Sequence, residues 1–420
     1  MLSGQPGSPS AYEVSTQLTQ QGHVANADWK ALAERQFEPE CLTLYLSNRC
    51  NLACTYCYAT PDDETRAQMR VRTAQENRGN GTVNDFPILQ KSEIEAAARL
   101  VGGHCAAKKI PITLVLHGGG EPTVHWDLVT WSWQVVARIA NEYGIGFSSY
   151  IATNGVLPED KVRWLSRHFD QIGLSCDGPP EVQDANRPTA AKTATSSIVQ
   201  RTARILKDEN ATFAVRATIT PELIERQTEI VEFVHDRMFA DTVRFEPAYY
   251  GRRKLKLFRP DDADRFVTQF WEARRVARRL GCHLELSGVR IDEIHGPFCN
   301  PLRQVLQLTP DGTASACFLS VGNDHATDSS MAIGQLDGMA GGFYVDESRV
   351  SIQKRQAAGI PSRCTSCHNI FHCARDCPDV CLLRPTHEDQ HREGFRCRVQ
   401  KLLGRYLIME LALQSVTNPT

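Results

Sequence analysis

The chain has 420 residues, enough for two or three domains that each bury a sizeable core. Its formal net charge at pH 7 is −2, which gives no electrostatic basis for binding nucleic acid or an anionic membrane. No apolar run reaches transmembrane length, and residues 1–27 lack the charged start and apolar core of a secretion signal. We therefore expect a cytoplasmic protein, in which the 15 cysteines bind metal more readily than they form disulfides.

After the N-terminal tail, the apolar spacing of Trp29–Phe37 predicts a short helix. Strand-like and helix-like segments then alternate. Apolar strands are predicted at Leu42–Leu46, Ile112–His117, Phe147–Ala152, Gln171–Ser175, Thr212–Ile219 and Thr242–Glu246. Amphipathic helices are predicted between them at Ser92–Val101, Asp127–Asn141, Glu159–Phe169, Ser196–Leu206 and Glu222–His235. This alternation predicts an α/β fold with a parallel sheet, open or partly closed into a barrel.

The ends of the first long helix have recognisable signals. Ser92 and Glu95 have the spacing of a capping box, and Gly102 follows the expected last turn. In parallel sheets the functional residues gather at the carboxyl ends of the strands. This rule draws attention to residues 47–60, SNRCNLACTYCYAT, which follow the first predicted strand.

Two stretches depart from the alternation. Residues 61–90 form a polar insertion that fits either a flap over the site or a solvated loop. After Pro260 the pattern predicts a long helix at Arg265–Leu280, a cysteine-dense loop region to Arg398, and a final helix at Val399–Leu413. The predicted units are an N-terminal segment (1–40), an α/β domain (41–258), a bridging helical region (259–290), a cysteine-rich domain (291–398) and a C-terminal helix (399–420).

Three cysteines lie close together after the first strand: Cys50, Cys54 and Cys57. A disulfide fragment, a zinc site and a redox cluster are the alternatives for such a group. A structural zinc needs four ligands and no open position, and no fourth Cys or His lies nearby in the sequence. A [4Fe–4S] cluster held by three thiolates instead leaves one iron free to bind another molecule. The triplet therefore favours an iron–sulfur cluster with one open position.

The pattern Cys-x3-Cys-x-aromatic-Cys, with Tyr56 as the aromatic residue, resembles the radical S-adenosylmethionine (SAM) enzymes. The resemblance implies that the open iron binds the amino and carboxylate groups of SAM. Reductive cleavage would then give methionine and a 5′-deoxyadenosyl radical that abstracts hydrogen from a substrate. The resemblance also implies a partial (β/α)6 TIM-like barrel and places Tyr56 near the adenine.

Further elements of the resemblance stand at the ends of successive predicted strands. The segment 119–122 (GGEP) resembles the element that contacts the methionine amino group, where glycine lets the backbone approach closely. Residues 153–155 and 175–179 resemble segments that line the SAM site in the peptide- and protein-modifying branch. Residues 184–187 (DANR) continue the resemblance, although Gln183 stands where a His is usual. The SAM-binding residues implied are Tyr56, Gly119, Gly120, Glu121, Asn154, Ser175 and Asp177.

The C-terminal cysteines form a second constellation. Eight cysteines follow residue 298, with the spacing Cys-x2-Cys-x5-Cys-x3-Cys starting at Cys364. They resemble the SPASM extension, a C-terminal domain that binds two auxiliary iron–sulfur clusters, expected to be [4Fe–4S]. The resemblance implies that one cluster uses Cys364, Cys367, Cys373 and Cys397. It implies that the other uses Cys299, Cys317 and Cys377. A zinc ribbon is the alternative for part of this set, and the upstream triplet disfavours it.

The second auxiliary cluster lacks an obvious fourth ligand, because residues 300–316 contain no cysteine. Either Cys381 supplies that ligand, or the site is open and can bind substrate. Cys381 is favoured, because a cysteine four residues beyond Cys377 is easily recruited.

Other sequence features have simpler interpretations. Four cysteines in apolar or strand-end contexts are expected to be unligated core thiols: Cys41, Cys105, Cys176 and Cys282. Residues 387–391 match the HExxH zinc-protease pattern, but Pro385 and the flanking cluster cysteines favour a solvated turn. The basic run at 252–256 fits either a contact for an acidic peptide or a solvated loop.

Three reactions compete within the family: cross-linking of side chains in a ribosomally made peptide, oxidation of a sulfatase Ser or Cys to formylglycine, and oxidation of a small molecule. Sulfatase-maturing relatives carry an Asp after the second SPASM cysteine as the proposed base, whereas Phe318 follows Cys317 here and cannot accept a proton. The roughly 40 residues before the first strand look short for a complete leader-recognition domain. Peptide cross-linking is therefore the favoured reaction.

The resemblance implies a precursor peptide or protein as substrate and a reductant such as flavodoxin or ferredoxin. A non-enzymatic alternative is an iron–sulfur electron carrier or scaffold. Such a carrier has no reason to keep the SAM elements at the strand ends, so the conjunction of those elements with the triplet favours an enzyme.

Overall fold

The computed structural model describes residues 29–59, 87–249, 258–291, 293–319, 331–338, 341–379, 381, 383 and 393–417. Three predicted features lie outside these residues: most of the insertion (residues 61–86), the basic run at 252–256 and the HExxH segment at 387–391. The predicted N-terminal helix is present as α2 (Trp29–Glu34).

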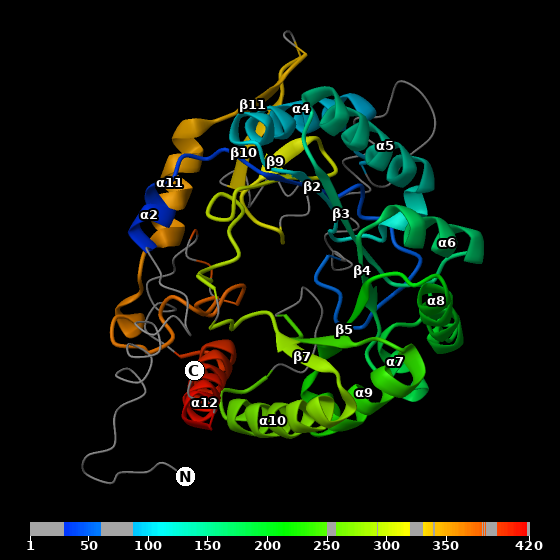
Figure 1. The fold of residues 1–420 in the computed structure, drawn as a ribbon, viewed down its shortest axis with the longest axis vertical. Helices are drawn as coiled ribbons and strands as arrows, with labels where there is room; N and C mark the ends of the chain where they lie inside the picture. Colours follow the sequence, from blue (N-terminus) through cyan, green and yellow to red (C-terminus); the bar gives the residue numbers. More distant parts are fainter. Residues whose placement is uncertain are drawn as a thin grey trace, which may run out of the picture.

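A single curved sheet organises the described chain, in the order β11-β10-β9-β8-β1-β2-β3-β4-β5-β6-β7. Figure 1 shows it bent into an open arc with helices on its outer side. The central strands are β1 (Cys41–Leu44), β2 (Ile112–Leu116), β3 (Phe147–Thr153), β4 (Gln171–Ser175), β5 (Phe213–Ile219), β6 (Thr242–Pro247) and β7 (His283–Leu286). All of them pair in parallel with their neighbours. The predicted α/β fold with a partial TIM-like barrel is confirmed.

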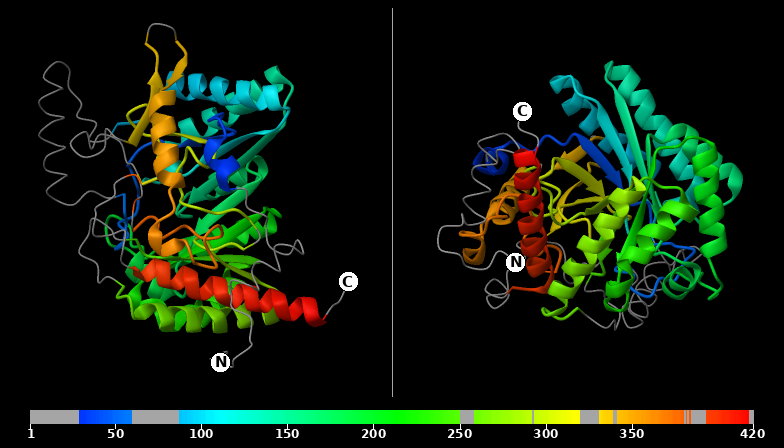
Figure 2. Two further views of the ribbon diagram at one scale, coloured as in Figure 1. Left: turned by 90° about the vertical axis from the view of Figure 1, so that its left-hand side faces the viewer. Right: turned by 60° about the horizontal axis from the view of Figure 1, so that its bottom comes forward.

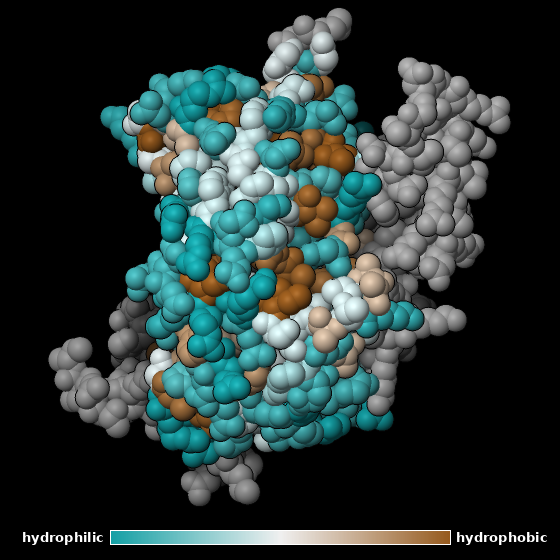
Figure 3. All heavy atoms as spheres, turned by 90° about the vertical axis from the view of Figure 1, so that its right-hand side faces the viewer, coloured by the Kyte–Doolittle hydropathy of each residue, from teal (hydrophilic) through white to brown (hydrophobic). Residues whose placement is uncertain are grey.

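The helices that connect these strands cover the outer side of the sheet. They are α4 (Lys91–Lys108), α5 (Trp126–Tyr143), α6 (Glu159–His168), α7 (Pro180–Asn186), α8 (Ser196–Asp208), α9 (Gln227–Phe233) and α10 (Asp262–Leu280). Short 3-10 turns at Pro122–His125 and Pro221–Arg226 precede α5 and α9, and a π-helical turn at Val234–Met238 follows α9. Figure 3 shows that the outer helical face is mainly polar with apolar patches interspersed, as amphipathic helices require.

The sheet continues beyond the six strands that the sequence predicts. β7 follows α10 and pairs in parallel with β6, so residues 259–290 extend the βα alternation. On the other side, β8 (Val305–Leu308) pairs in parallel with β1. β9 (Thr313–Ser315), β10 (Ala332–Leu336) and β11 (Phe343–Val345) then add antiparallel strands. The predicted domain boundaries stay predictions.

The C-terminal region lies across the open side of the arc. It includes α11 (Glu347–Ala358), a 3-10 turn at Ser362–Cys364 and α12 (Phe395–Thr417). Figure 2 shows α12 running alongside α10 at one edge of the molecule. In the described part of the chain, no helix combines the length and the apolar character that a bilayer span requires.

The start and end of α4 differ from the sequence prediction. The capping box uses Gln90 and Glu93 instead of Ser92 and Glu95, and the helix runs through Gly102 to Lys108. A Cβ on Gly102 would lie 3.0 Å from Ile139 and Tyr143 of α5. Gly102 therefore lets two helices pack closely and does not end one, which only the tertiary structure reveals.

Alternation along the strands separates two environments. In β5, Val215, Ala217 and Ile219 are buried in the apolar core beneath the helices. The residues between them, Arg216 and Thr218, point to the other face and line the cavity at the centre of the arc. The position of a residue along a strand thus decides whether it packs in the core or reaches the candidate site.

Candidate functional site

A cavity of about 200 Å³, open to solvent, lies at the carboxyl ends of β2 to β6. The loop after β1 supplies three of its wall residues, Cys50, Cys54 and Cys57. Most of the predicted SAM-binding residues also line it: Tyr56, Gly119, Gly120, Glu121, Asn154 and Ser175. The structure therefore gathers into one site residues that lie up to 125 positions apart in the chain (175 − 50).

The cysteine loop is held in place by main-chain hydrogen bonds. Ala53 N donates to the carbonyl oxygen of Pro188 at 2.8 Å, and Thr55 N donates to that of Asn186 at 2.9 Å. The side-chain amide nitrogen of Asn51 also donates to the carbonyl oxygen of Val156, a residue that follows β3, at 2.8 Å. The loop is thus fastened to two other parts of the barrel, so its thiols are presented from a fixed backbone.

Asn154 joins the cysteine loop to the end of β3. Its Nδ2 donates to Asn51 Oδ1 at 2.7 Å and lies 3.8 Å from the sulfur of Cys50. Its Oδ1 accepts from Val156 N at 2.9 Å. The side chain therefore orients the loop next to the first cysteine, while its direct contact with SAM stays a prediction.

Glycine at positions 119 and 120 allows the cysteine loop to approach the end of β2. A Cβ on Gly120 would lie 2.3 Å from the carbonyl oxygens of both Ser47 and Arg49, and one on Gly119 would meet the Tyr45 ring. The sequence explains these glycines by a close approach to the ligand. The structure shows that their nearest neighbour is the chain's own loop.

We expect Gly120→Ala to displace the cysteine loop, because the added methyl group cannot coexist with two backbone oxygens at 2.3 Å. Displacement of reacting groups by about 1 Å can cost about 100-fold in rate, so SAM cleavage measured by 5′-deoxyadenosine formation should fall by about that factor. The matched control is Gly103→Ala in α4, where a Cβ meets nothing within 4 Å. Wild-type cleavage in Gly120→Ala would contradict this account.

Glu121 is a buried carboxylate that ties the ends of β2 and β3 together. Its Oε1 accepts from Thr123 N at 3.2 Å, Thr123 Oγ1 at 2.7 Å and Thr153 Oγ1 at 2.8 Å, and its Oε2 accepts from Asn154 N at 2.7 Å. Burial raises the pKa of this carboxyl, and the donated hydrogen bonds oppose that shift. Four of its acceptor positions are thus used inside the protein.

Tyr56, Asp177 and Arg187 form a buried polar group behind the cysteine loop. The Tyr56 hydroxyl donates to Asp177 Oδ2 at 2.5 Å, and Arg187 Nε lies 3.0 Å from Asp177 Oδ1. Thr218 N also donates to Asp177 Oδ1, at 2.9 Å. Asp177 is fully buried and does not line the cavity, so its carboxylate positions Tyr56 and Arg187, which do.

Gln183 occupies the position where the resemblance leads one to expect His. Its Oε1 accepts from Asp177 N at 3.0 Å, and its Nε2 donates to Thr195 Oγ1 at 3.2 Å. Asp184 accepts from the main chain of Thr195 and Ser196 at the start of α8. An amide carries both a donor and an acceptor, so Gln183 can position the strand end without any charge.

The C-terminal cysteines assemble into two groups. Burial, followed by the neighbouring thiols Cys377, Cys317 and Cys381, raises the pKa of Cys299 well above its usual range. Burial raises the pKa of Cys373 to about 12, and the thiols of Cys367, Cys364 and Cys397 add to this shift. The first group, which we call the 299 group, is Cys299, Cys317, Cys377 and Cys381. The second, the 373 group, is Cys364, Cys367, Cys373 and Cys397.

The chemistry of these donor sets fits iron–sulfur clusters better than single ions. Within the described ranges, no three His, Cys, Asp or Glu side chains converge closely enough to hold one metal ion. Thiolates around a [4Fe–4S] cluster bind different iron atoms, so they need not converge on one point. Three thiols at an open cavity and two groups of four in the C-terminal region match one SAM-binding and two auxiliary clusters.

The predicted core thiols lie apart from these groups. Cys105, Cys176 and Cys282 are buried, and each sulfur donates to a backbone carbonyl oxygen nearby: those of Glu40, Gly178 and Ala240. Cys41 is partly buried beside Thr43 Oγ1. Burial raises the pKa of Cys105 to about 11, so this thiol stays protonated and unreactive at pH 7.

Sequence reasoning missed a second wall of the cavity. It consists of Tyr58, His117, Arg216, Glu246, Tyr249 and Phe318. Arg216 and Glu246 are charged residues within apolar strands, and that placement is the signal that could have revealed them. Their common site appears only when the curved sheet directs the ends of β2, β5 and β6 toward one cavity.

Arg396 connects the C-terminal region to this second wall. Its Nη2 donates to Pro247 O at 2.5 Å and Ala248 O at 3.0 Å, and its guanidinium lies 4.6 Å from the centre of the Tyr249 ring. Arg396 Nε also pairs with Asp379 at 2.9 Å. Since Arg396 directly precedes Cys397, the 373 group is linked through the chain to the cavity wall.

Comparisons with known proteins agree with this geometry. Residues 44–234 match the Radical SAM superfamily. The cysteine-type anaerobic sulfatase-maturating enzyme of Clostridium perfringens is 23% identical over 236 residues, which cover 54% of this chain and 57% of that enzyme. The chain therefore matches a little over half the length of this relative. The serine-type enzyme of Klebsiella aerogenes is 25% identical over 346 residues, which cover 78% of this chain and 77% of that enzyme.

A solved structure of native anSMEcpe with bound AdoMet and Cp18Cys peptide has a similar fold. It aligns with a TM-score of 0.65 at 18% identity and covers 91% of this chain and 100% of that one. The fold and the cysteine site match those of radical SAM proteins. Residues 44–234 are a radical SAM domain, and the chain is similar over a longer range to sulfatase-maturating enzymes. Its cofactors are a SAM-binding [4Fe–4S] cluster, SAM and auxiliary iron–sulfur clusters.

Proposed function

We propose that this protein modifies a peptide by abstracting hydrogen from one of its side chains, with cross-linking of two side chains as the outcome. The observation that carries the proposal is the two-sided cavity. One wall holds the three thiols and the glycine strand end, and the other holds tyrosines, Phe318 and the charged pair of Arg216 and Glu246. The cavity is open to solvent and has both apolar and polar lining side chains, as binding sites for small molecules commonly have.

The residues that would hold the cofactors follow from the site. Cys50, Cys54 and Cys57 would bind the [4Fe–4S] cluster, which with SAM supplies the hydrogen-abstracting radical when reduced. Tyr56, Gly119, Gly120, Glu121, Asn154 and Ser175 line the space for SAM, and Asp177 holds Tyr56 from behind. The reductant is a small electron-transfer protein such as flavodoxin or ferredoxin.

Formylglycine-type oxidation of a Ser or Cys side chain is the second candidate. The relatives of Clostridium and Klebsiella are sulfatase-maturating enzymes, which favours it. Phe318 disfavours it, because this residue lines the cavity where those relatives are expected to place an Asp. Both reactions begin with hydrogen abstraction from a peptide, so one experiment can separate them.

The test uses the anaerobically reconstituted protein with a reductant and SAM. The probes are peptides encoded beside the gene and 18-residue sulfatase peptides with Cys or Ser, each deuterated at side-chain carbons. We expect deuterium in 5′-deoxyadenosine and a cross-linked product with altered fragmentation by mass spectrometry. A product that reacts with a hydrazide is an aldehyde and would favour the second candidate. Cleavage of SAM without deuterium transfer from any probe would refute both.

We propose Cys381 as the fourth ligand of the 299 group, because its thiol lies close enough to those of Cys299 and Cys377 to interact with both electrostatically. Cys381→Ser should lower the iron content from about twelve to about eight per chain, as one [4Fe–4S] cluster is lost. The matched control is Cys282→Ser, a buried thiol outside both groups. Iron content and Mössbauer spectra measure the outcome. Full iron content in Cys381→Ser would show that this cluster has three protein ligands and an open position.

A further inference from the structure

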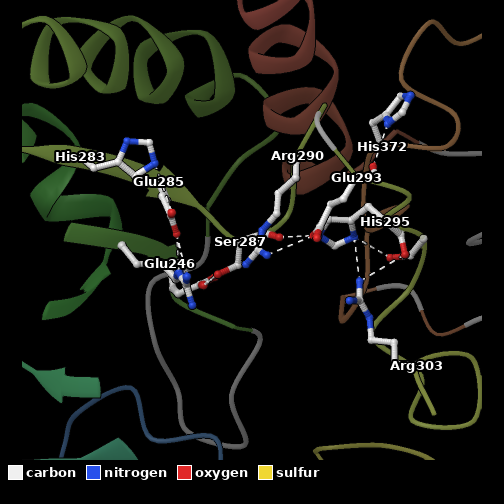
Figure 4. A network of polar contacts seen from close by, with 11 residues as sticks. Glu246, His283, Glu285, Ser287, Arg290, Glu293, His295, Arg303 and His372 are labelled. Atoms are coloured by element: carbon white, nitrogen blue, oxygen red, sulfur yellow. Dashed lines mark hydrogen bonds and ion pairs between the residues drawn. The ribbon is translucent and has the colours of Figure 1, made fainter. Parts of the chain in front are cut away.

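A second carboxylate faces the cavity, that of Glu246 at the end of β6. The residue is 9% exposed, and Figure 4 shows its side chain at one end of a connected series of polar residues. The other carboxylate that lines the cavity in the described chain is Glu121, which already accepts four hydrogen bonds. Glu246 is therefore the cavity carboxylate that has acceptor positions left for a substrate.

Two side chains hold Glu246 from different strands. Ser287, just after β7, donates its hydroxyl to Glu246 Oε1. Arg216 on β5 places Nη2 3.9 Å from the same oxygen. Nη1 of Arg216 donates to Nε2 of His117 at 3.0 Å. Glu246 Oε1 thus has a fixed position, which a proton acceptor in a reaction requires.

Ser287 is itself positioned by a buried histidine. His295 Nε2 lies 2.6 Å from the Ser287 carbonyl oxygen, and Nη2 of Arg303 lies 3.1 Å from His295 Nδ1 (Figure 4). His295 Nδ1 also lies 2.7 Å from the carbonyl oxygen of Gly296, so both ring nitrogens face carbonyl oxygens and the ring is held between two backbone segments. Burial, followed by Arg303, lowers the pKa of His295 to about 4, which keeps the ring neutral at pH 7.

The same network reaches the auxiliary cysteines. Arg303 is exposed to solvent on one side, and its charge interacts electrostatically with the thiols of Cys377 and Cys299. Contacts thus run from the cavity carboxylate through Ser287 and His295 to Arg303, and the charge of Arg303 acts on two thiols of the 299 group.

The other titratable residues of this wall are poor proton acceptors. Burial, followed by the charge of Arg216, lowers the pKa of His117 to about 3, so this ring is a weak base and stays neutral at pH 7. Burial raises the pKa values of Tyr58 and Tyr249 well above their usual range, so both phenols stay protonated. Arg216 has no acceptor atom. Among the described residues of this wall, Glu246 is the one carboxylate.

We propose that Glu246 accepts the proton that the substrate loses after hydrogen abstraction, with Ser287 and His295 as its positioning residues. The assignment rests on the proposed function. A substrate carbon radical next to an O–H, S–H or N–H group, or one attacked by such a group, gives up one electron and one proton as the new bond forms. An auxiliary iron–sulfur cluster held by the C-terminal cysteines would accept the electron, and the Glu246 carboxylate takes up the proton. Atoms and charge then balance.

The position of Phe318 supports this assignment. Phe318 follows Cys317 and lines the same cavity, with its ring 6.1 Å from that of Tyr249. The acidic group expected after this cysteine in sulfatase-maturing relatives is therefore absent, while a carboxylate from β6 reaches the cavity from another wall. The chain supplies a base from a different strand.

The test compares Glu246→Gln with the reconstituted wild-type protein on the deuterated peptide probes. The amide keeps the shape and can still accept from Ser287, but it cannot take up the proton. General-base catalysis contributes at least about 100-fold, so product formation should fall by about that factor. Cleavage of SAM and deuterium transfer into 5′-deoxyadenosine should continue, since both precede the proton transfer. The readout is the ratio of product to deuterated 5′-deoxyadenosine.

Glu285→Gln is the matched control. Glu285 lies on β7 and pairs with Arg244 at 2.7 Å and His283 at 3.2 Å, away from the cavity lining. Its product ratio should equal that of the wild type. An unchanged ratio in Glu246→Gln would overturn the assignment and leave the proposed function intact. If no probe transfers deuterium to the wild type, the proposed function fails and this assignment fails with it.

Ser287 tests the positioning role separately. Ser287→Ala should lower the product ratio without lowering deuterium transfer, because Glu246 Oε1 loses its hydroxyl donor. Ser287→Thr keeps the hydroxyl and should restore the ratio. An equal loss in both variants would mean that Ser287 is needed for packing only, and it would overturn the positioning assignment.

Discussion

Replacing Cys50, Cys54 and Cys57 together with alanine should abolish SAM cleavage and leave the auxiliary iron in place. These thiols share one loop and one cavity, whereas the C-terminal cysteines form separate groups. Three [4Fe–4S] clusters would give about twelve irons per chain, of which about eight should remain in the triple variant. Iron analysis measures the remaining clusters, and ultraviolet chromatography measures 5′-deoxyadenosine.

Cys41→Ala is the control for this experiment. Cys41 begins β1, just before the loop, and its sulfur lies beside Thr43 outside the cavity lining. This variant should retain both iron and cleavage. Survival of SAM cleavage in the triple variant would contradict the central assignment. Loss of all iron would instead mean that the three thiols support the folding of the whole chain.

Asp177→Asn should have the largest effect on stability of any substitution discussed here. The fully buried carboxylate faces Arg187 at 3.0 Å and accepts from Tyr56 and Thr218. Neutralising it leaves the guanidinium buried without a counter-charge, which typically costs about 3–5 kcal/mol. Urea unfolding of the reconstituted protein under anaerobic conditions should show a lower midpoint. SAM affinity should also fall, because Tyr56 and Arg187 line the cavity.

Glu181→Gln is the matched control for Asp177→Asn. Glu181 also pairs with an arginine, Arg226 at 2.5 Å, but its side chain is 62% exposed. Water and salt screen such a pair, so the change should stay within about 1 kcal/mol. An equal shift of the unfolding midpoint in both variants would show that burial of the Asp177–Arg187 pair does not decide how much the pair contributes to the free energy of unfolding.

The order of strands and helices was predictable because the apolar periodicity is strong. The predicted strand at Gln171–Ser175 is observed with the same bounds, and the helix at Glu159–Phe169 is observed at Glu159–His168. The bounds of α4 were wrong, because the prediction treated Gly102 as a helix end. Close packing against α5 determines that glycine, and no local signal carries this information.

The cavity residues likewise divide into those that the sequence indicated and those that only the structure placed. The triplet and the strand-end elements stand in short motifs, so the sequence alone indicated them. Asp177 was predicted to bind the cofactor, but the structure places it behind the cavity wall, where Tyr56, Arg187 and Thr218 surround it. A motif identifies a residue without telling whether its side chain faces the ligand or the protein interior.

By itself, the sequence determined the class of chemistry, because thiol spacing within a loop is a local property that restricts which metal centre can form. Only the tertiary structure decided that Arg216 and Glu246 face a common cavity with Phe318. These residues come from strands and loops far apart in the chain. Their proximity depends on how the sheet curves and on which side of each strand faces inward, and those are properties of packing between elements.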